Sequence, residues 1–505
     1  MSAKNVEHKF IVPNSVEIRD YQVNLANQAK NENCLIILPT GLGKTVVALH
    51  VMADYLTKGN GGVLFLAPTK VLVNQHYEFL KNTLAIDDIG MITGEVLLTK
   101  RKKLWINSVI CATPEISRND IARKIVDTTQ FNLIIFDEAH RAVGDYAYVE
   151  IAKQLSGSNV RLLGMTATLP SEKEKAKEIC DNLHVRSLAE RNDSSPDVKP
   201  YIQETKTEWV TVDLSPDLKV IQRYLKLALD QRYTELRRNG LRLSDNKSLS
   251  QLLNSRQFVL KRNIRSAKPL FTAIRITYAL NIFEAHGITP FLKFCDRTKI
   301  KKGAGIKELF ETDQNFMQAI DLAKNQQANG IEHPKIDKLV EILRNIESKV
   351  LIFSSYRDSV DVIQKKLVSM NIAAEILIGK AGKTGLKQEK QIEVVQRFRD
   401  GITKALVATR VGEEGLDISE VNLVIFYDNV PSSIRFVQRK GRTGRKDAGR
   451  LVVLIAKDTI DEAYYWIGKR KVKLASNMAD KITKHLEKTE QVMDDFFNYD
   501  NLLII

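Results

Sequence analysis

Two short segments of this chain carry side chains suited to the hydrolysis of a nucleoside triphosphate. The first is a glycine-rich turn made of Pro39, Thr40, Gly41, Leu42, Gly43, Lys44 and Thr45. Backbone N–H groups of such a turn bind phosphates, while Lys44 reaches the β and γ oxygens and Thr45 ligates Mg²⁺. The second segment, residues 137–140, supplies Asp137 to the metal and Glu138 to orient and deprotonate water. Together they predict an ATP site with Lys44 and Glu138 as catalytic residues.

Each segment follows an apolar run typical of a buried strand, residues 35–38 and residues 131–136. A strand that feeds a glycine-rich turn and then a helix is the arrangement that phosphate binding needs. Leu38 departs from the strict pattern, which has a glycine there, so a chance Gly-Lys-Thr turn is the alternative for the first segment alone. The Asp-Glu-Ala-His sequence at the end of a later apolar run argues against that alternative.

The composition predicts a large protein with a polyanionic partner. The chain has 505 residues, 44% of them hydrophobic, which is enough for three domains with separate cores. The formal net charge of +15 indicates a negatively charged partner. No apolar run has membrane-spanning length, and residues 1–10 lack the apolar stretch of a signal peptide. We therefore expect a cytoplasmic protein, nucleoid-associated if prokaryotic, with its four scattered cysteines reduced.

Strand-like apolar runs divide the chain into two α/β regions. They occur at 63–66, 108–111, 134–136 and 161–164, and again at 350–353, 374–378, 405–408, 423–427 and 450–455. Between about residues 214 and 327 helical periodicity replaces them. We predict an α/β fold of two parallel-sheet domains, residues 1–205 and 331–505, separated by an all-helical, thumb-like insertion of residues 206–330. The last residues of the second domain are expected to form a C-terminal tail.

The positive charge is concentrated in the insertion. Residues 221–302 contain 18 Lys or Arg and 5 Asp or Glu, so they carry +13 of the net +15. A solvated spacer is the alternative, but a spacer usually mixes both signs. The clusters Arg237 with Arg238 and Lys261 with Arg262 therefore predict a surface for a nucleic-acid backbone. Few aromatic residues lie among them, so we expect contacts to the backbone rather than to stacked bases.

Further segments closely resemble superfamily 2 helicases, and within them the archaeal Hef, FANCM and Mph1 group. The resemblance runs from about residue 16 to about residue 469. It implies two RecA-like motor domains, a Q motif at residues 18–22 in which Arg19 and Gln22 hold the adenine, and Thr166 and Thr168 as couplers, with His140, between the ATP and nucleic-acid sites. The residues of the first domain that would grip the nucleic-acid phosphates are Pro68, Thr69, Lys70, Gln75, Thr93, Gly94, Thr113 and Pro114.

The same resemblance assigns residues in the second domain. Ser355 and Thr409 would contact nucleic acid, and Asp417 would contact the nucleotide. The segment 438–445 resembles motif VI, which supplies Gln438 and the arginine fingers Arg442 and Arg445. Both arginines would meet the γ-phosphate of ATP held by the opposite domain, so hydrolysis would depend on closure of the two domains. Arg410 departs from the family pattern, in which a small residue is common.

These motifs predict an ATP-driven DNA translocase. By resemblance it would move 3′ to 5′, bind forked or branched DNA such as stalled forks and Holliday junctions, and act in replication-fork repair and recombination. An ATPase activated by duplex RNA, of the Dicer-like or RNA-sensor type, is the main alternative. Hef relatives often continue into a nuclease domain with a Glu-Arg-Lys motif, which does not occur here. We therefore expect a motor only, with any nuclease acting in trans.

The C-terminal segment 490–497 allows two interpretations. Met493 followed by Phe496 and Phe497 resembles the peptide that binds a sliding clamp, in which one aliphatic and two aromatic side chains fill an apolar pocket. Glu490 departs from that peptide, which has glutamine there. The same i, i+3, i+4 spacing also suits a terminal helix that docks on its own domain, and we favour this docking on the second motor domain.

Overall fold

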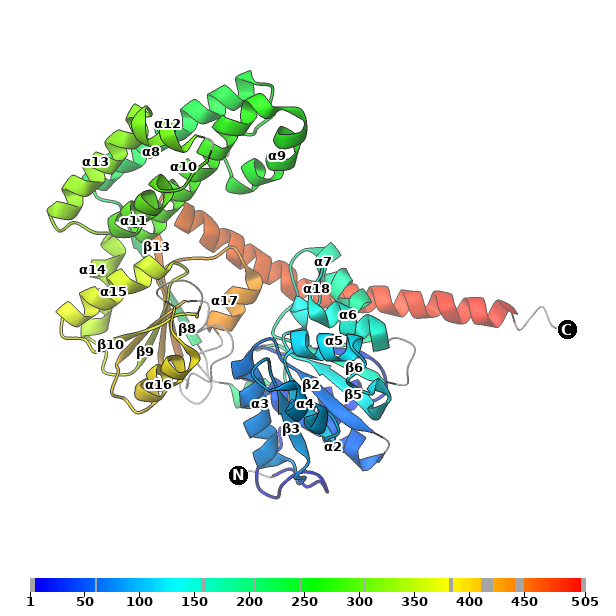
Figure 1. Ribbon diagram of the computed structural model, residues 1–505. Helices are drawn as coiled ribbons and strands as arrows, with labels where there is room; N and C mark the ends of the chain where they lie inside the picture. The colour runs from blue at the N-terminus through cyan, green and yellow to red at the C-terminus, as the bar shows by residue number, and fades with distance from the viewer. Residues whose placement is uncertain are drawn as a thin grey trace.

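The computed structural model describes residues 5–500 except 60, 156–159, 203–204, 246, 304, 381–384, 410–420 and 441–448, and it leaves out the side chains of 433, 440, 485 and 487–500. Two α/β domains and a helical domain are visible in Figure 1, and a long C-terminal helix runs from one α/β domain to the other. Among the described helices, none is both long and apolar enough to span a membrane. All four cysteines are free and buried.

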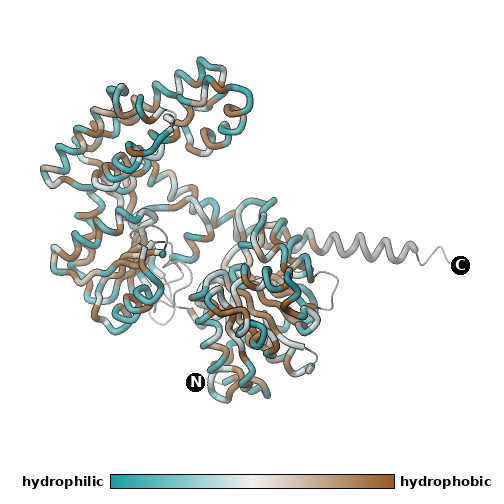
Figure 2. Tube along the Cα trace, in the orientation of Figure 1, coloured by the Kyte–Doolittle hydropathy of each residue, from teal (hydrophilic) through white to brown (hydrophobic). Residues whose placement is uncertain are grey.

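The first α/β domain is built on a seven-stranded parallel sheet of order β3-β4-β2-β5-β6-β1-β7. Successive side chains point to opposite faces, so Leu35 and Ile37 enter one core cluster while Cys34 and Ile36 enter the other. Brown, hydrophobic strands fill the interior of the domain in Figure 2. The strands are β1 (Cys34–Ile37), β2 (Gly62–Leu66), β3 (Ile89–Ile92), β4 (Val109–Ala112), β5 (Phe131–Phe136), β6 (Arg161–Thr166) and β7 (Ser187–Glu190).

Helices cover both faces of this sheet, as the βαβ connections of a parallel sheet require. Helices α1 to α3 contribute to one core cluster, and α5 to α7 contribute to the other. The helices are α1 (Asp20–Ala29), α2 (Lys44–Thr57), α3 (Lys70–Thr83), α4 (Leu98–Leu104), α5 (Pro114–Ala122), α6 (Ala147–Leu155) and α7 (Lys173–Asn182).

The second α/β domain has a six-stranded parallel sheet of order β10-β11-β9-β12-β13-β8. Its strands are β8 (Thr205–Val212), β9 (Val350–Phe353), β10 (Ala374–Leu377), β11 (Ala405–Ala408), β12 (Leu423–Phe426) and β13 (Gly449–Ala456), and its helices are α14 (Pro334–Arg344), α15 (Arg357–Ser369), α16 (Gln388–Arg399) and α17 (Ser433–Lys440). Strand β8 pairs with β13 along its whole length. Residues 205–212 therefore belong to the second sheet, whereas the predicted boundary at 205/206 assigns nearly all of them to the insertion.

The described residues between 216 and 328 form helices joined by loops. Its helices are α8 (Pro216–Arg238), α9 (Leu249–Arg262), α10 (Ala267–His286), α11 (Ile288–Lys299), α12 (Ile306–Glu311) and α13 (Gln314–Ala328). Ser215, Ser248 and Asp313 cap α8, α9 and α13 by accepting a backbone N–H of the first turn. The predicted class, two parallel-sheet domains with many helices, is confirmed.

Buried polar contacts fasten the insertion to the second α/β domain. Glu284 of α10 accepts a hydrogen bond from the backbone N–H of Ile460 at 2.8 Å, and its carbonyl oxygen lies 3.0 Å from His333 Nε2. Nearby, the fully buried side chains of Lys335 and Asp461 form an ion pair at 3.0 Å. This pair lies within the second domain, between α14 and the start of the C-terminal helix, and Arg297 of α11 forms an ion pair with Asp358 of α15 across the boundary at 2.6 Å. We therefore expect the insertion and the second domain to move as one unit.

Helix α18 (Ile460–Asp500) links the two α/β domains. Its first turns lie against α17, β13 and α10, and Met478, Ala479 and Ile482 are buried in the core of the first domain. Lys471 Nζ also lies 2.8 Å from Glu172 Oε1 of the first domain. This part of the helix therefore docks on the first domain, because its apolar stripe completes the core beside α7. The side chains of residues 490–497 lie outside the described part, and the clamp-binding peptide stays a prediction.

The contact between α18 and the first domain is expected to depend on pH. Burial, and then the charge of Asp480 on α18, raise the pKa of Glu190 to about 7. In the unfolded chain a glutamic acid ionises near pH 4.3, as an approximate reference value. Between these two values the folded protein holds a proton that the unfolded chain has lost, so stability falls as the pH rises from about 4 to about 7.

Glu190→Gln, which stays neutral, is expected to stabilise the protein strongly at pH 8 and only slightly at pH 5. The gain in melting temperature is about 2–4 °C for each kcal/mol in a domain of this size. Thermal unfolding of both proteins at the two pH values measures the difference. An equal shift at pH 5 and pH 8 would contradict the assigned titration.

Candidate active site and nucleic-acid interface

The predicted residues of the first domain gather at one edge of its sheet. Since all its strands are parallel, their carboxyl ends share that edge, which is where α/β proteins bind ligands. The glycine-rich turn follows β1, residues 137–140 follow β5, and Thr166 ends β6. The segments predicted to grip nucleic acid follow the neighbouring strands: 68–70 after β2, 93–94 after β3 and 113–114 after β4. Thus β5 and β6 lie between the nucleotide side and the nucleic-acid side.

The glycine-rich turn requires its last glycine. Gly43 has a φ of 78° at the start of α2, and a Cβ there would lie 2.4 Å from Gln22 Nε2. Gln22 Nε2 donates to the Leu42 carbonyl at 3.0 Å, and Lys44 Nζ donates to the Leu38 carbonyl at 3.1 Å. Gln22 Oε1 is buried without a hydrogen-bond partner among the described residues. That acceptor fits the amino group of an adenine, so the residues present fit ATP. Arg19 lies at the start of α1, close by.

Two carboxylates follow β5, and both are buried. Glu138 has a φ of 50°, a strained conformation for a residue with a side chain, and such strain is common at active sites. Asp137 Oδ2 lies 2.8 Å from His76 Nε2. Burial opposes ionisation of Asp137, but the hydrogen bond with His76 and the nearby charges of His76 and Lys44 outweigh it and hold the pKa of this carboxyl below its usual value. Asp137 is therefore an anion, as a metal ligand must be.

A chain of polar contacts leads from Glu138 to Thr166, the last residue of β6, and on to Thr168. His140 Nδ1 lies 3.2 Å from Glu138 Oε2 and 3.1 Å from Thr166 Oγ1. The Thr166 hydroxyl donates to the Thr168 carbonyl at 3.0 Å, so it accepts from His140. The three residues predicted to couple the two sites therefore lie in contact with one another and with the predicted base.

The predicted nucleic-acid residues of the first domain differ in accessibility. Lys70 forms an ion pair with Glu95, which joins the segments after β2 and β3. Thr69 caps α3 by accepting the Leu72 N–H at 3.2 Å. Thr93, Thr113 and Pro114 are buried, while Pro68 and Gln75 are partly exposed and Gly94 borders open space. A bound strand would therefore meet backbone groups at the buried positions, as contacts to phosphates allow.

In the second domain, Ser355, two residues beyond the end of β9, contacts the motif VI helix α17. The Ser355 N–H donates to Asp428 Oδ1 at 2.8 Å, and its Oγ accepts from Arg439 Nη2 at 3.1 Å. Gln438 is buried, and neither of its amide atoms has a hydrogen-bond partner in the described part of the chain. Thr409 follows β11 and is buried. The predicted residues Asp417, Arg442 and Arg445 lie outside the described residues.

Sequence patterns did not identify His76 and Arg439. Arg439 is fully buried, donates to the Asp428 carbonyl at 3.0 Å and lies over the rings of Phe353 and Phe426. The signal for His76 is its position directly after the predicted contact Gln75, but its partner Asp137 is 61 residues away. Only the fold brings these side chains to the site.

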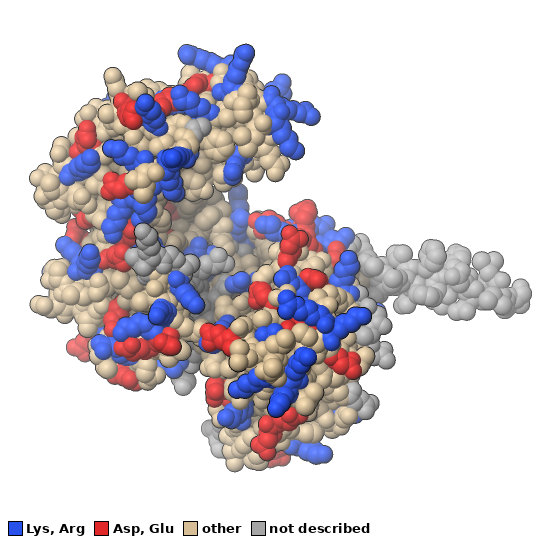
Figure 3. Space-filling view, in the orientation of Figure 1, with Lys and Arg blue, Asp and Glu red and all other residues tan. Residues whose placement is uncertain are grey.

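The basic residues of the insertion divide into paired and unpaired ones. Arg237 Nη2 donates to Asp245 Oδ1 at 2.6 Å, so a neighbouring carboxylate offsets part of its charge. Arg238, Lys261 and Arg262 are exposed, and the described part of the chain offers them no ion pair. Figure 3 shows Lys and Arg side chains gathered on the α9 end of the insertion. Of the four predicted residues, these three are the available cations.

Comparisons with known proteins identify the family. Residues 15–171 match the family model described as "Type III restriction enzyme, res subunit", and residues 334–447 match "Helicase conserved C-terminal domain". The crystal structure of the Hef helicase domain of Pyrococcus furiosus is 36% identical to this chain, with a TM-score of 0.63, and the match covers 90% of this chain and 98% of that one.

Longer relatives are similar over nearly the whole chain. ATP-dependent DNA helicase MPH1 of Pyricularia oryzae is 34% identical over 88% of this chain and 44% of its own length. A Methanocaldococcus jannaschii protein, described as a candidate ATP-dependent RNA helicase, is 36% identical over 95% of this chain and 64% of its own length. The mouse homologue of the Fanconi anemia group M protein is 32% identical, but the chain spans 25% of it. The predicted resemblance is thus confirmed: the chain belongs to the Hef, FANCM and Mph1 group of superfamily 2 ATP-dependent helicases.

Proposed function

We propose that this protein is an ATP-driven motor that translocates 3′ to 5′ on DNA and remodels forks and Holliday junctions during repair and recombination. The observation that supports the proposal is the chain of contacts from the predicted base Glu138 through His140 to Thr166 and Thr168, the residues predicted to couple ATP hydrolysis to nucleic-acid binding. Relatives that are named ATP-dependent DNA helicases, such as MPH1 and fml1, favour DNA as the track.

The proposed chemistry follows from the groups at the sheet edge. Lys44 binds the β and γ phosphate oxygens, and Glu138 accepts a proton from the attacking water. Thr45 and the ionised Asp137 would hold Mg²⁺, which neutralises phosphate charge when bound. Gln438, with its unsatisfied amide, and the arginine fingers Arg442 and Arg445 approach the phosphates when the domains close. Hydrolysis therefore requires closure, and the release of the phosphate allows the domains to open.

Translocation then follows from backbone contacts on both domains. The segments after β2, β3 and β4 grip one strand in the first domain, and Ser355 and Thr409 grip it in the second. Because these contacts reach phosphates, each cycle of closure moves the grip without regard to sequence. The insertion moves with the second domain and holds the duplex arm through Arg238, Lys261 and Arg262.

The test is stimulation of ATP hydrolysis by a single strand, a duplex, a fork, a Holliday junction and an RNA duplex at one salt concentration. We expect the fork and the junction to give the largest stimulation. An ATPase activated by duplex RNA is the second candidate, since the Methanocaldococcus jannaschii relative carries an RNA helicase description. Stronger stimulation by the RNA duplex than by any DNA would establish it instead.

His76 is expected to tune the metal site. His76→Ala removes the hydrogen-bond partner of Asp137, and loss of such a partner costs about 10- to 100-fold in metal affinity or activity. We expect the Mg²⁺ concentration for half-maximal ATP hydrolysis to rise by that factor. His76→Gln keeps an N–H donor and is expected to give an intermediate value. An unchanged Mg²⁺ requirement in His76→Ala would show that this contact does not position Asp137.

A further inference from the structure

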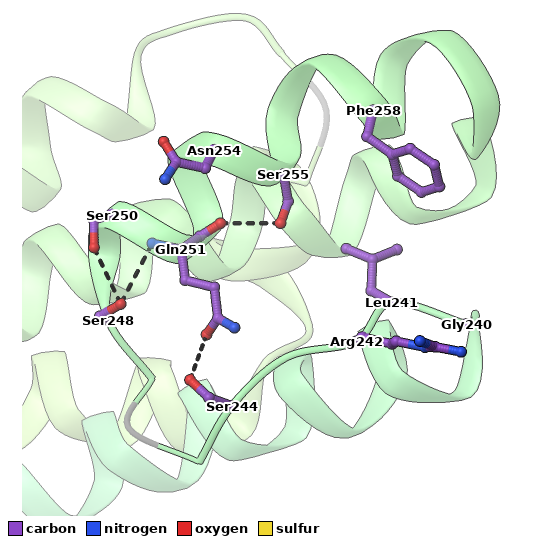
Figure 4. A pocket seen from close by; sticks show the side chains of 10 residues that line it. All are labelled: Gly240, Leu241, Arg242, Ser244, Ser248, Ser250, Gln251, Asn254, Ser255 and Phe258. Atoms are coloured by element: carbon purple, nitrogen blue, oxygen red, sulfur yellow. Dashed lines mark hydrogen bonds between the residues drawn. The ribbon is translucent and has the colours of Figure 1, made fainter.

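The insertion carries a pocket that strand gripping by the motor domains does not use. It lies between α9 and the loop after α8, and its volume is about 710 Å³ (Figure 4). Pockets that bind small organic groups have volumes of roughly 300–1,000 Å³. A single nucleotide is a group of this class, and so the pocket is large enough for one.

The polar end of the pocket is preformed. Ser244 Oγ donates to Gln251 Oε1 at 3.0 Å, and Ser248 Oγ accepts the Gln251 N–H at 3.3 Å while it caps α9. These bonds hold the loop after α8 against the first turn of α9. The wall of the pocket is therefore fixed before any ligand arrives, which lowers the entropic cost of binding.

The other end presents unsatisfied groups. The Phe258 ring is 51% exposed and faces Leu241 across the pocket, with Arg242 beside Leu241 (Figure 4). The side chains of Arg242 and Asn254 are exposed, and the described residues provide neither with a hydrogen bond or an ion pair. An aromatic face, a free guanidinium and a free amide together suit a base, its phosphate and its polar edge.

The surroundings favour a polyanion as the occupant. Helix α9 contains no Asp or Glu. Lys261 and Arg262 lie three and four positions after Phe258, so they share its face of the helix. Arg238 ends α8 where the loop begins. The pocket therefore opens onto a basic track, which fits a nucleic acid and opposes most protein surfaces by charge.

We propose that this pocket binds one unpaired nucleotide of a branched nucleic acid. The base stacks on Phe258, its phosphate binds Arg242, and Asn254 hydrogen-bonds the base edge or the sugar. A base within a duplex has both faces covered by its neighbours, so only an unpaired base can enter. The insertion then recognises the branch point itself, beyond the backbone contacts expected from sequence. This inference rests on the proposed action on branched DNA.

The test compares binding to a fork with unpaired arms and to a continuous duplex of equal length, at one salt concentration. Stacking of a base on an aromatic side chain is worth about 1–3 kcal/mol, so Phe258→Ala is expected to weaken fork binding about 5- to 150-fold. Duplex binding is expected to stay unchanged. Phe258→Tyr keeps the ring and is expected to restore binding. Leu260→Ala is the matched control, since Leu260 is 49% exposed on the same helix and does not line the pocket.

Photocrosslinking gives an independent result. A 5-iododeoxyuridine placed at the unpaired position next to the branch is expected to crosslink to the peptide that contains Phe258. If Phe258→Ala loses equal affinity for the fork and for the duplex, or loses affinity for neither, the pocket proposal is overturned. Stimulation of the wild-type ATPase by the fork is measured in parallel. Its absence would overturn the proposed function, whereas normal stimulation with unchanged fork binding by Phe258→Ala overturns the pocket alone.

Discussion

Glu138→Gln is expected to lower kcat for ATP hydrolysis by about 10²- to 10⁴-fold while ATP stays bound. Glutamine fills the same space beside His140 but accepts no proton from water, so the chemical step stalls. Thr45, Asp137 and Lys44 are untouched, and nucleotide affinity is therefore retained. Steady-state hydrolysis and equilibrium binding of a fluorescent ATP analogue measure the two quantities.

Lys44→Ala is expected to differ from Glu138→Gln in its affinity for the nucleotide. It removes a phosphate contact, so both nucleotide affinity and turnover fall. Glu78→Gln is the control for loss of a carboxylate, because Glu78 lies exposed in the second half of α3, which runs back from the sheet edge. Hydrolysis by Glu138→Gln at the wild-type rate would show that another group deprotonates the water.

Reversal of Arg238, Lys261 and Arg262 to Glu is expected to give the largest loss of DNA binding. Each phosphate contact adds about one to the slope of log affinity against log salt, so three lost contacts are expected to flatten that slope by about three. Hydrolysis without DNA is expected to persist, because the catalytic groups lie in the α/β domains. Titration of a labelled fork at several salt concentrations gives both affinity and slope.

The matched control reverses Lys365, Lys387 and Lys457, which are exposed and without an ion pair among the described residues, so the net charge changes equally but on the second domain. Arg237→Glu is expected to have a smaller effect than Arg238→Glu, since Arg237 is already paired with Asp245. If the triple reversal in the insertion and the control weaken fork binding alike, the effect belongs to the overall charge and not to the insertion surface.

Local patterns predicted the elements that hold the ATP site. The apolar runs before Pro39 and Asp137 are the buried strands β1 and β5, because a strand covered on both faces needs a continuous apolar sequence. The predicted runs at 63–66 and 108–111 correspond to β2 and β4, which precede two of the nucleic-acid segments, whereas β3 before residues 93–94 was not predicted. In the insertion, charge counts predicted a basic helical surface, but they did not show that Asp245 pairs with Arg237.

Contacts between distant residues were not predictable in this way. His76 and Asp137 are 61 positions apart, and Arg439 and Ser355 are 84 positions apart. Neither contact can be recognised from the spacing of residues within one helix or strand. Strand β8 is separated from its partner β13 by the whole insertion. Helix α18 shows an apolar stripe in its sequence, but a stripe does not say which domain it covers. In the structure, the apolar stripe of α18 packs in the core of the first domain.

Unwinding of a forked DNA and of a matched RNA duplex, each with ATP and without it, tests the central claim most directly. The account predicts that wild-type protein separates the strands of the DNA fork only with ATP, that it requires a 3′ tail on the loading strand, and that Glu138→Gln separates none. The RNA duplex is expected to remain paired. Efficient separation of the RNA duplex, or equal separation of the DNA fork by Glu138→Gln, would contradict an ATP-driven DNA motor.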